Sequence, residues 1–398
     1  MGMTSRDIRL LGLVAFASMA SMRMCDPMLL QWSTDFGVSQ GQASHVIAAF
    51  SIAYGVMQLI YGPLGQRLGS LRLITWAAGI SAVLSIITAV SSGLDALLLA
   101  RSAMGGVAAA IIPLSMAWIG DQVAYDSRQQ TLARLMSATV TGLMAGQWFG
   151  GFATQYLGWR WAFALLALLF ATGFMLLFRS YMYRSQAAAS QQAKGSAVDY
   201  LRGTLALLQL TNVQRVLLLT FSEGALAFGG LVFVPSMLIQ DFSLSASAAG
   251  AAMLLYGVGG LMYSQFAKRW INWLGEAGLA LTGGICIACG LVLLLLVSPA
   301  INGALLACLI IGLGFYMLHN VLQTQATQMA PHNRSTAVTL FASVLFLGQS
   351  TGVVLLSMCL DAGLLHQAFV AVAAGIALIG FAVSRHSLSN IRSITSVS

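Results

Sequence analysis

About twelve long apolar segments divide this chain, and the short stretches between them differ sharply in charge. Of nineteen Lys and Arg residues, sixteen lie at the termini or in one alternating set of connecting stretches, and only Arg160 lies in the other set. A membrane-spanning helix needs about 20 mostly apolar residues, and basic residues concentrate in short loops on the cytoplasmic side. The pattern therefore predicts a multi-pass membrane protein with both termini in the cytoplasm.

The composition supports an all-α integral membrane fold. Hydrophobic residues make up 58% of the chain and charged residues 8%, more apolar surface than a water-soluble fold can bury. In lipid only helices and closed barrels satisfy all backbone hydrogen bonds, and a barrel would show weaker, alternating segments of about ten residues. We place the twelve spans at residues 10–32, 43–65, 73–92, 96–119, 133–155, 160–180, 213–239, 246–267, 277–298, 302–329, 336–358 and 364–384.

A polar, basic stretch over residues 181–212 separates two sets of six spans. We predict an N-terminal six-helix bundle (1–180), a cytoplasmic linker (181–212) with a short amphipathic helix from 199 to 210, and a C-terminal six-helix bundle (213–398). The halves repeat in detail, because YGPLGQRLG (61–69) matches YSQFAKRWI (263–271) and Gly146-Gln147 matches Gly348-Gln349. Duplicated bundles predict pseudo-symmetric halves with a site between them near the midplane.

Several other classes fit the chain poorly. The basic residues are scattered over many loops without interleaved aromatic residues, so the net charge of +8 does not indicate nucleic-acid binding. The five His residues show no HExxH spacing, and no GxxxxGK[ST] loop is present, so we expect neither an enzyme nor a nucleotide or metal cofactor. A receptor or scaffold would not need a duplicated bundle with buried acids. The expected partners are a small-molecule substrate and the lipid bilayer, with no obligate protein partner.

Four charged side chains lie deep in the predicted spans: Arg23, Asp26, Arg101 and Glu223. Each costs at least about 2.5–3.5 kcal/mol at membrane depth, so we assign these residues to proton coupling. Arg23 and Asp26 share a helix face, and Asp26 and Arg101 lie at similar depths, which predicts a contact between them. Glu223 has no basic neighbour within a helical turn, and burial favours the protonated form of such a carboxyl group. The alternatives are a permanent ion pair for Asp26 and a neutral, hydrogen-bonded packing role for Glu223.

A polar stripe at helical spacing marks the tenth span as a candidate substrate surface. It consists of Tyr316, Asn320, Gln323, Thr324 and Thr327, with His319 beside it. Such a stripe faces either a watery cavity or another helix. Gln147 and Trp148 in the fifth span, and Gln349 in the eleventh, are further candidates.

Glycines repeat every four residues in the fifth span, at Gly142, Gly146 and Gly150. Small residues at this spacing let a second backbone approach closely in a membrane. The same surface suits a static helix contact or a sliding gate contact, and both interpretations stay open. Arg67 and Arg72 are either surface cations that follow the orientation rule or parts of a gate.

Several motifs, taken in order along the chain, resemble those of one family. They are DPMLL (26–30), GPLGQRLGSLR (62–72), LLLARSAMGGVAAA (97–110), the glycines 142, 146, 150 and 151, GWRWAF (158–163) and LHNVLQTQATQMAPHNRSTAV (318–338). On these motifs nearly the whole chain resembles the major facilitator superfamily, particularly its twelve-span drug:proton antiporter group.

The resemblance implies a secondary active transporter that exports small amphiphilic compounds or drugs by alternating access. It implies protons as the coupling ion, a bacterial-type inner membrane, and a cavity lined by the first, fourth, seventh and tenth spans. The polar stripe of the tenth span is therefore expected to face this cavity. It also implies a gate built from Gly62, Gln66, Arg67, Gly69, Arg72, Gly142, Gly146, Gly150 and Gly151.

The chain departs from the family pattern at three positions. Gln66 replaces an acidic residue that is expected to brace the gate, Gln147 replaces a Pro, and Ala133 replaces the first Gly of the fifth-span motif. The alternative function is proton-coupled import or export of a specific small metabolite, such as a sugar or an amino-acid derivative.

Overall fold

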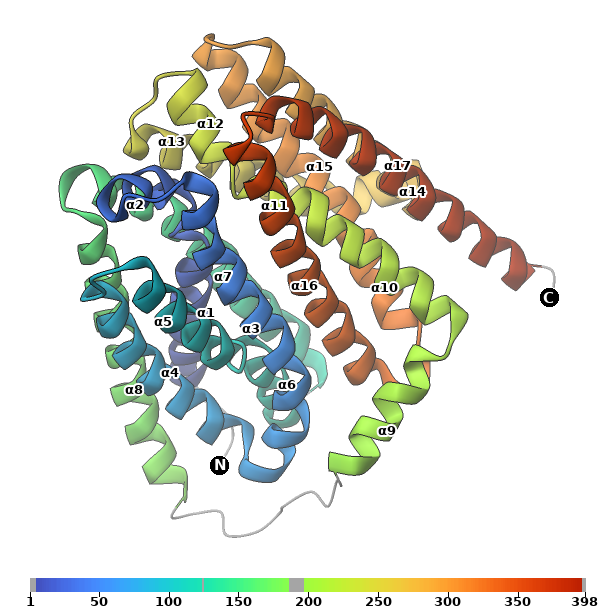
Figure 1. Ribbon diagram of the computed structural model, residues 1–398. Coiled ribbons are helices and arrows are strands. Elements are labelled where there is room, and N and C mark those ends of the chain that lie inside the picture. The colour runs from blue at the N-terminus through green and yellow to red at the C-terminus, as the bar shows by residue number, and fades with distance from the viewer. Residues whose placement is uncertain (1–4, 124, 186–196, 396–398) are drawn as a thin grey trace.

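All regular structure in the described part of this chain is helical. The computed structural model describes residues 5–123, 125–185 and 197–395, and Figure 1 shows them as a bundle of long helices. The first part contains α1 (Ser5–Arg23), η1 (Asp26–Met28), α2 (Leu29–Phe36), α3 (Gln40–Leu68), α4 (Ser70–Ala89), α5 (Leu94–Ala108), α6 (Ile111–Gln122), α7 (Tyr125–Tyr156) and α8 (Trp159–Ser185).

The second part has a similar succession of broken and continuous helices. It contains α9 (Ala197–Leu208), α10 (Thr211–Glu223), the π-helical turn η2 (Gly224–Phe228), α11 (Gly229–Leu231), α12 (Val234–Asp241), α13 (Ala246–Ala252), α14 (Leu254–Leu296), α15 (Ile301–Gln328), η3 (Pro331–Asn333), α16 (Arg334–Asp361) and α17 (Leu365–Thr395).

Ten helical stretches in the described residues are long and apolar enough to cross a membrane. One of them, Ala246–Leu296, contains two spans, because Gly275 interrupts α14 with φ 64° and ψ 177°. Gly259 and Gly290, on opposite sides of this break, both pack against α15 between residues 307 and 313, so the chain reverses between them. The less apolar α7 covers the remaining predicted span. The predicted all-helical membrane fold is confirmed.

The predicted linker is described only in part, since residues 186–196 lie outside the described residues. Helix α9 lies where the short amphipathic helix is predicted, and it packs against α3, α10 and α16. The proposed domain boundaries remain a prediction.

Close backbone contacts explain the glycine pattern of α7. A Cβ atom on Gly142 or Gly146 would overlap the backbone of α1 at Phe16 and Ala20, and one on Gly150 would overlap Met24, directly after α1. The second half repeats this packing, because Gly348 and Gly352 of α16 approach the backbone of α10 and η2 in the same way. Membrane helices associate by such close packing, since lipid supplies little hydrophobic drive between them.

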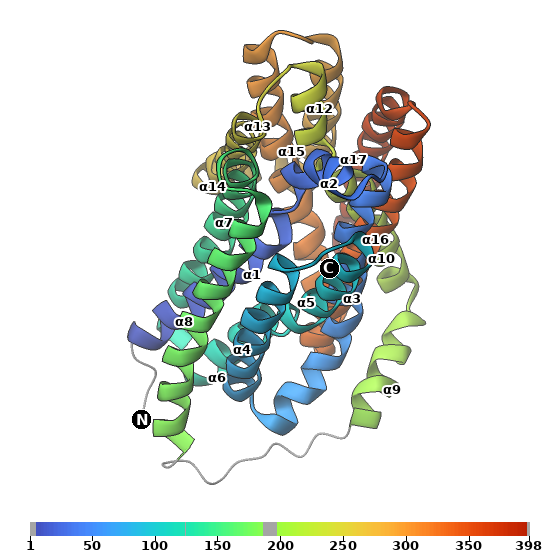
Figure 2. The same cartoon turned by 60° about the vertical axis from the view of Figure 1, so that its left-hand side comes forward.

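Apart from the contact of α9 with α3, the main contacts between the two halves run from one end of the bundle to mid-helix. We call the end with Arg67, Arg72 and α9 the basic end, and the opposite end, with Asp35, Asp95 and Asp361, the distal end. Contacts between α3 and α16 run from Gly41 and Asp361 at the distal end to Gly55 and Ser343 near mid-helix. Helix α13 packs against the distal part of α7, as Figure 2 shows. In Figure 1 α3 and α16 diverge towards the basic end.

Candidate functional site

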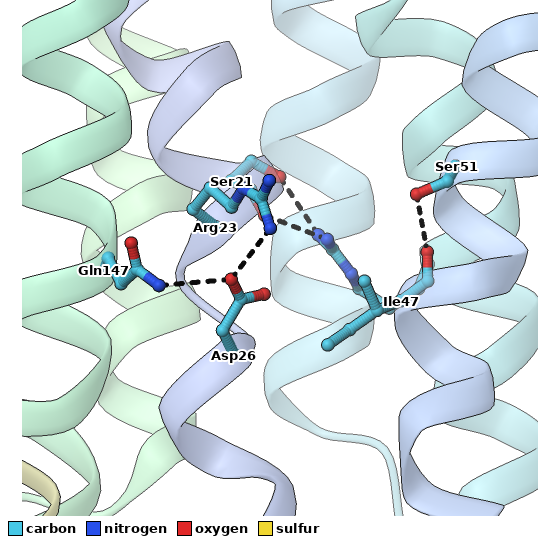
Figure 3. A network of polar contacts seen from close by, with 7 residues as sticks. Ser21, Arg23, Asp26, Ile47, Ser51 and Gln147 are labelled. Carbon is cyan, nitrogen blue, oxygen red and sulfur yellow. Dashed lines mark hydrogen bonds and ion pairs between the residues drawn. The ribbon is translucent and has the colours of Figure 1, made fainter. Parts of the chain in front are cut away.

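A break between α1 and α2 positions the first buried acid. Pro27 cannot donate a backbone hydrogen bond, and α1 ends at Arg23 before the short turn η1 begins at Asp26. Asp26 Oδ2 accepts hydrogen bonds from Arg23 Nη1 (3.1 Å) and Gln147 Nε2 (3.2 Å). Figure 3 shows these two side chains approaching Asp26 from different helices. The structure thus brings together three predicted residues, Arg23, Asp26 and Gln147, and buries all three.

Arg101 has a different partner from the predicted one. It donates from Nη1 to Ser21 Oγ (3.0 Å) and from Nη2 to the Ser21 carbonyl (2.9 Å), and its guanidinium group lies 4.2 Å from the centre of the Phe50 ring. Asp26 Oδ1 has no hydrogen-bond partner. The predicted direct Asp26–Arg101 contact is therefore not formed, because both Nη atoms of Arg101 bond Ser21 in the last turn of α1, although the two charges still interact electrostatically.

Arg23 also reaches into the second half of the molecule. Its guanidinium carbon lies 4.3 Å from the centre of the Phe228 ring in η2, a cation–π geometry. The Phe228 ring stacks on Phe315 of α15, with ring centroids 5.2 Å apart. The sequence alone does not indicate this connection, since aromatic residues are common in spans and no spacing links positions in different helices.

The second buried acid lies where α10 changes to a π-helical turn. Glu223 is the last residue of α10 and is fully buried, and its Oε2 lies 3.1 Å from His319 Nδ1 on α15. Glu223 was predicted to be isolated, and that description holds only along its own helix. The signal for its partner was in the sequence, because His319 lies beside the polar stripe.

The α15 stripe lies within the second half, with several helices around it. Tyr263 of α14 donates to Asn320 Oδ1 (3.0 Å), and the Tyr316 ring packs against Gly260 of α14. His319 lies against Phe341 of α16, with ring centroids 5.5 Å apart. Gln323, one turn further towards the basic end, is exposed.

Trp148 does not join this surface. It is 40% exposed and lines an apolar pocket of about 180 Å³ between α1, α7 and α8, together with Phe16 and Leu165. Although Trp148 follows Gln147 directly in sequence, successive residues on a helix point about 100° apart. Trp148 therefore lies apart from the α15 stripe, and its role in the substrate cavity stays a prediction.

The predicted gate residues fall into separate groups. Gln66, Arg67, Gly69 and Arg72 are exposed where α3 ends and α4 begins at the basic end, and Gly62 lies within α3. The glycines that face α1 join helices of the same half. Gly151 alone of the four α7 glycines meets the other half, since a Cβ atom there would overlap the backbone of α13 at Ala246. Within the described residues, no three His, Cys, Asp or Glu side chains could hold a metal ion.

A membrane bundle with buried acids and bases beside the boundary between two sets of helices has the organisation of a secondary transporter. The chain belongs to the Major Facilitator Superfamily, whose family model matches residues 11–353. Its family and fold are those of transporters and not of enzymes.

Two relatives and one solved structure illustrate the similarity. The chain is 25% identical over 338 residues to the "Uncharacterized MFS-type transporter YceJ" of Bacillus subtilis, covering 83% of each chain. It is 30% identical over 129 residues to the "Multidrug export protein EmrB" of Haemophilus influenzae, covering 32% of this chain and 25% of EmrB. A crystal structure of a mutant of the nucleoside transporter NupG has a similar fold, with a TM-score of 0.77 at 12% identity, covering 94% of this chain and 98% of that one.

Proposed function

We propose that this chain is a proton-coupled exporter of small amphiphilic compounds that works by alternating access. In this proposal it lies in a bacterial-type inner membrane with both termini in the cytoplasm. Membership of the family makes it a transporter. The coupling ion, the direction of transport and the substrate class are the proposed parts.

The distribution of charge and of contacts supports the direction. Basic residues are retained on the cytoplasmic side of membranes, so the basic end is the cytoplasmic end. The Asp361 carboxylate accepts hydrogen bonds from the Ser39 hydroxyl and the Gly41 backbone N–H, and these bonds join the halves at the distal end. This arrangement corresponds to a state that is closed to the outside, into which a compound would enter from the cytoplasm.

The single observation that carries proton coupling is the pair of buried acids with basic partners. Asp26 and Glu223 both have zero relative exposure, and their carboxylates contact Arg23 and His319 respectively. Protonation of Asp26 would remove the charge that holds Arg23, and Arg23 also contacts Phe228 of the other half. A proton bound at Asp26 would therefore weaken the Asp26–Arg23 ion pair and alter the Arg23–Phe228 contact between the halves.

The surface along α15 supports an amphiphilic substrate. Amide and hydroxyl groups of Asn320, Gln323 and Thr324 lie beside aromatic residues such as Phe315 and Tyr316, and the stripe itself carries no Asp, Glu, Lys or Arg. Neutral hydrogen-bonding groups among aromatic rings suit compounds with a large apolar surface. The similarity to EmrB, a multidrug export protein, agrees with this class.

A specific polar metabolite is the second candidate, favoured by the Tyr263–Asn320 hydrogen bond. An ordered amide and hydroxyl pair of this kind can recognise one substrate hydroxyl group with high selectivity.

Purified protein in proteoliposomes can test the proposal. With the interior more acidic than the outside, we expect accumulation of ethidium, an amphiphilic cation, but not of radiolabelled xylose or uridine. Asp26→Asn and Glu223→Gln should abolish the response to the pH gradient, whereas Asp95→Asn, a change to an exposed acid of the distal end, should not. Ethidium movement that ignores the gradient, or full coupling in both buried-acid variants, would contradict proton coupling.

A further inference from the structure

Glu223 is sealed from water, yet one of its neighbours is not. The Glu223 side chain has zero exposure and its Oε1 has no hydrogen-bond partner. The His319 side chain, whose Nδ1 lies 3.1 Å from Glu223 Oε2, keeps 19% exposure. A proton that reaches or leaves this carboxyl group in the present conformation must therefore pass through a neighbouring group. His319 contacts the carboxyl group, and its two ring nitrogens can donate and accept a proton.

The surroundings hold the His319 ring in a fixed orientation. The ring stacks on Phe315 with centroids 5.1 Å apart and planes within 11°, and it lies against Phe341 on α16. These contacts direct Nδ1 at Glu223 and leave Nε2, on the far edge of the ring, for water.

The water would come from the basic end. Gln323 lies one turn beyond His319 on the same face of α15, Asn320 lies at the edge of that face, and both are exposed. Contacts from this face reach α10 through Glu223, α14 through Tyr263 and α16 through Phe341, so the face points into the space enclosed by these helices. Helix α15 ends at Gln328, shortly before the basic residue Arg334, so the stripe leads to the basic end.

Asp26, the other buried acid, does not offer Glu223 a comparable path for protons. Between Asp26 and His319 lie Arg23, Phe228 and Phe315, in a continuous series of contacts. The rings of Phe228 and Phe315 carry no group that can accept and release a proton. The buried Tyr256 hydroxyl interacts electrostatically with both Arg23 and Glu223, but it has no hydrogen-bond partner. No hydrogen-bonded path therefore joins the two acids through these residues, and we assign each acid its own exchange path.

We propose that His319 is the residue through which Glu223 exchanges its proton with water at the basic end. This rests on the proposed function, in which Glu223 is a coupling acid. For release, the Glu223 Oε2–H bond breaks as a His319 Nδ1–H bond forms, and the proton on Nε2 passes to water. Uptake reverses these steps, so no oxidant or other reactant is needed.

Removal of the imidazole should uncouple transport without preventing substrate movement. For His319→Ala, we expect the rate driven by a pH gradient to fall by at least about 100-fold, the lower limit of the usual contribution of general acid–base catalysis. Ethidium counterflow, an exchange that needs no net proton movement, reports any effect of the variant on substrate binding, so the ratio of driven transport to counterflow is the quantity that should fall. His319→Gln, which keeps a polar side chain, should behave in the same way and covers the case in which the alanine variant is poorly folded.

Added imidazole should restore driven transport several-fold in His319→Ala. Pyrazole has a similar size and shape but is a far weaker base, so it should not. A His366→Gln variant is the matched control: His366 Nε2 lies 2.9 Å from Asp241, but its side chain is 58% exposed at the distal end. We expect normal driven transport for this control.

Two results would overturn the relay. One is driven transport at the wild-type rate in both His319 variants while Glu223→Gln is uncoupled. The other is equal restoration by pyrazole, which would show that the ring only fills space. Normal coupling in Glu223→Gln would instead contradict the part of the proposed function that makes Glu223 a coupling acid, so the two failures are distinguishable.

Discussion

Asp361 joins the two halves of the molecule at the distal end, and its removal should open that end. Its carboxylate accepts from Ser39 Oγ (2.7 Å) and from the backbone N–H of Gly41 (3.0 Å), at the start of α3. Ser39 also accepts from the Gln42 N–H in a capping box, so the hydroxyl serves its own helix and the other half at once. Asp361 lies at the end of α16, and its charge complements the positive N-terminus of α3.

The size of the effect follows from the number and exposure of these bonds. A hydrogen bond to a charged group contributes about 1.5–3 kcal/mol, and an acid at an exposed helix N-terminus about 0.3–1 kcal/mol. Asp361 is exposed, so solvent screening reduces the first figure strongly. We therefore expect Asp361→Ala to destabilise the distally closed state by about 1.4 kcal/mol, a tenfold change in the equilibrium. Asp361→Asn, which keeps an acceptor, should have about half this effect.

Distance measurements by electron paramagnetic resonance can report the equilibrium between the distally closed and distally open states. Spin labels at Thr34 and Gln367, two exposed distal positions in opposite halves, can be introduced after replacement of the five native Cys residues. Asp361→Ala should increase the population with the longer label separation. A double-mutant cycle with Ser39→Ala isolates the contact from the capping role of Ser39.

Two further variants sharpen the result. Asp95→Ala removes an exposed acid from the same end and should leave the distances unchanged. Gly41→Ala should mimic Asp361→Ala, because a Cβ atom at Gly41 would overlap the Asp361 carboxylate. If the distance distribution of Asp361→Ala matches that of wild type, the reasoning about this contact is refuted.

Two predictions concern packing and burial. Gly146→Ala should lower the free energy of unfolding by about 1–3 kcal/mol, since its Cβ would overlap the Ala20 backbone. Gly120→Ala should leave stability unchanged, because no atom lies within 4 Å of a Cβ atom at that position. Equal melting temperatures for the two variants would contradict the packing argument. Arg101→Lys should lower the melting temperature and the transport rate, because an ammonium group cannot reproduce the two-nitrogen contact and the stacking of a guanidinium group. The exposed Arg67→Lys is its control, and wild-type stability in Arg101→Lys would mean that the guanidinium geometry is unimportant.

Much of the architecture was predictable from local patterns. Apolar length marked the spans, the distribution of Lys and Arg marked the basic end, and Gly142, Gly146 and Gly150 marked a close helix contact. The buried charges at Arg23, Asp26, Arg101 and Glu223 were also recognisable, and the structure buries all of them. Each of these features is a property of one helix in lipid.

The partners of those charges were not predictable in the same way. Glu223 and His319 are 96 residues apart, and Asp26 and Gln147 are 121 apart. Arg101 contacts Ser21 and not Asp26, and Trp148 faces a lateral pocket while its neighbour Gln147 contacts Asp26. Small differences in the rotation of one helix against another decide such contacts.

The amino-acid sequence by itself determined which segments enter the membrane, where they break and which charges they carry, because hydropathy, proline and glycine act within a single helix. Only the tertiary structure decided that Arg23 lies over Phe228, that His319 meets Glu223 and that Asp361 reaches the start of α3. These contacts depend on how the helices pack side by side, and hydropathy along one helix carries no information about its rotation relative to a distant one.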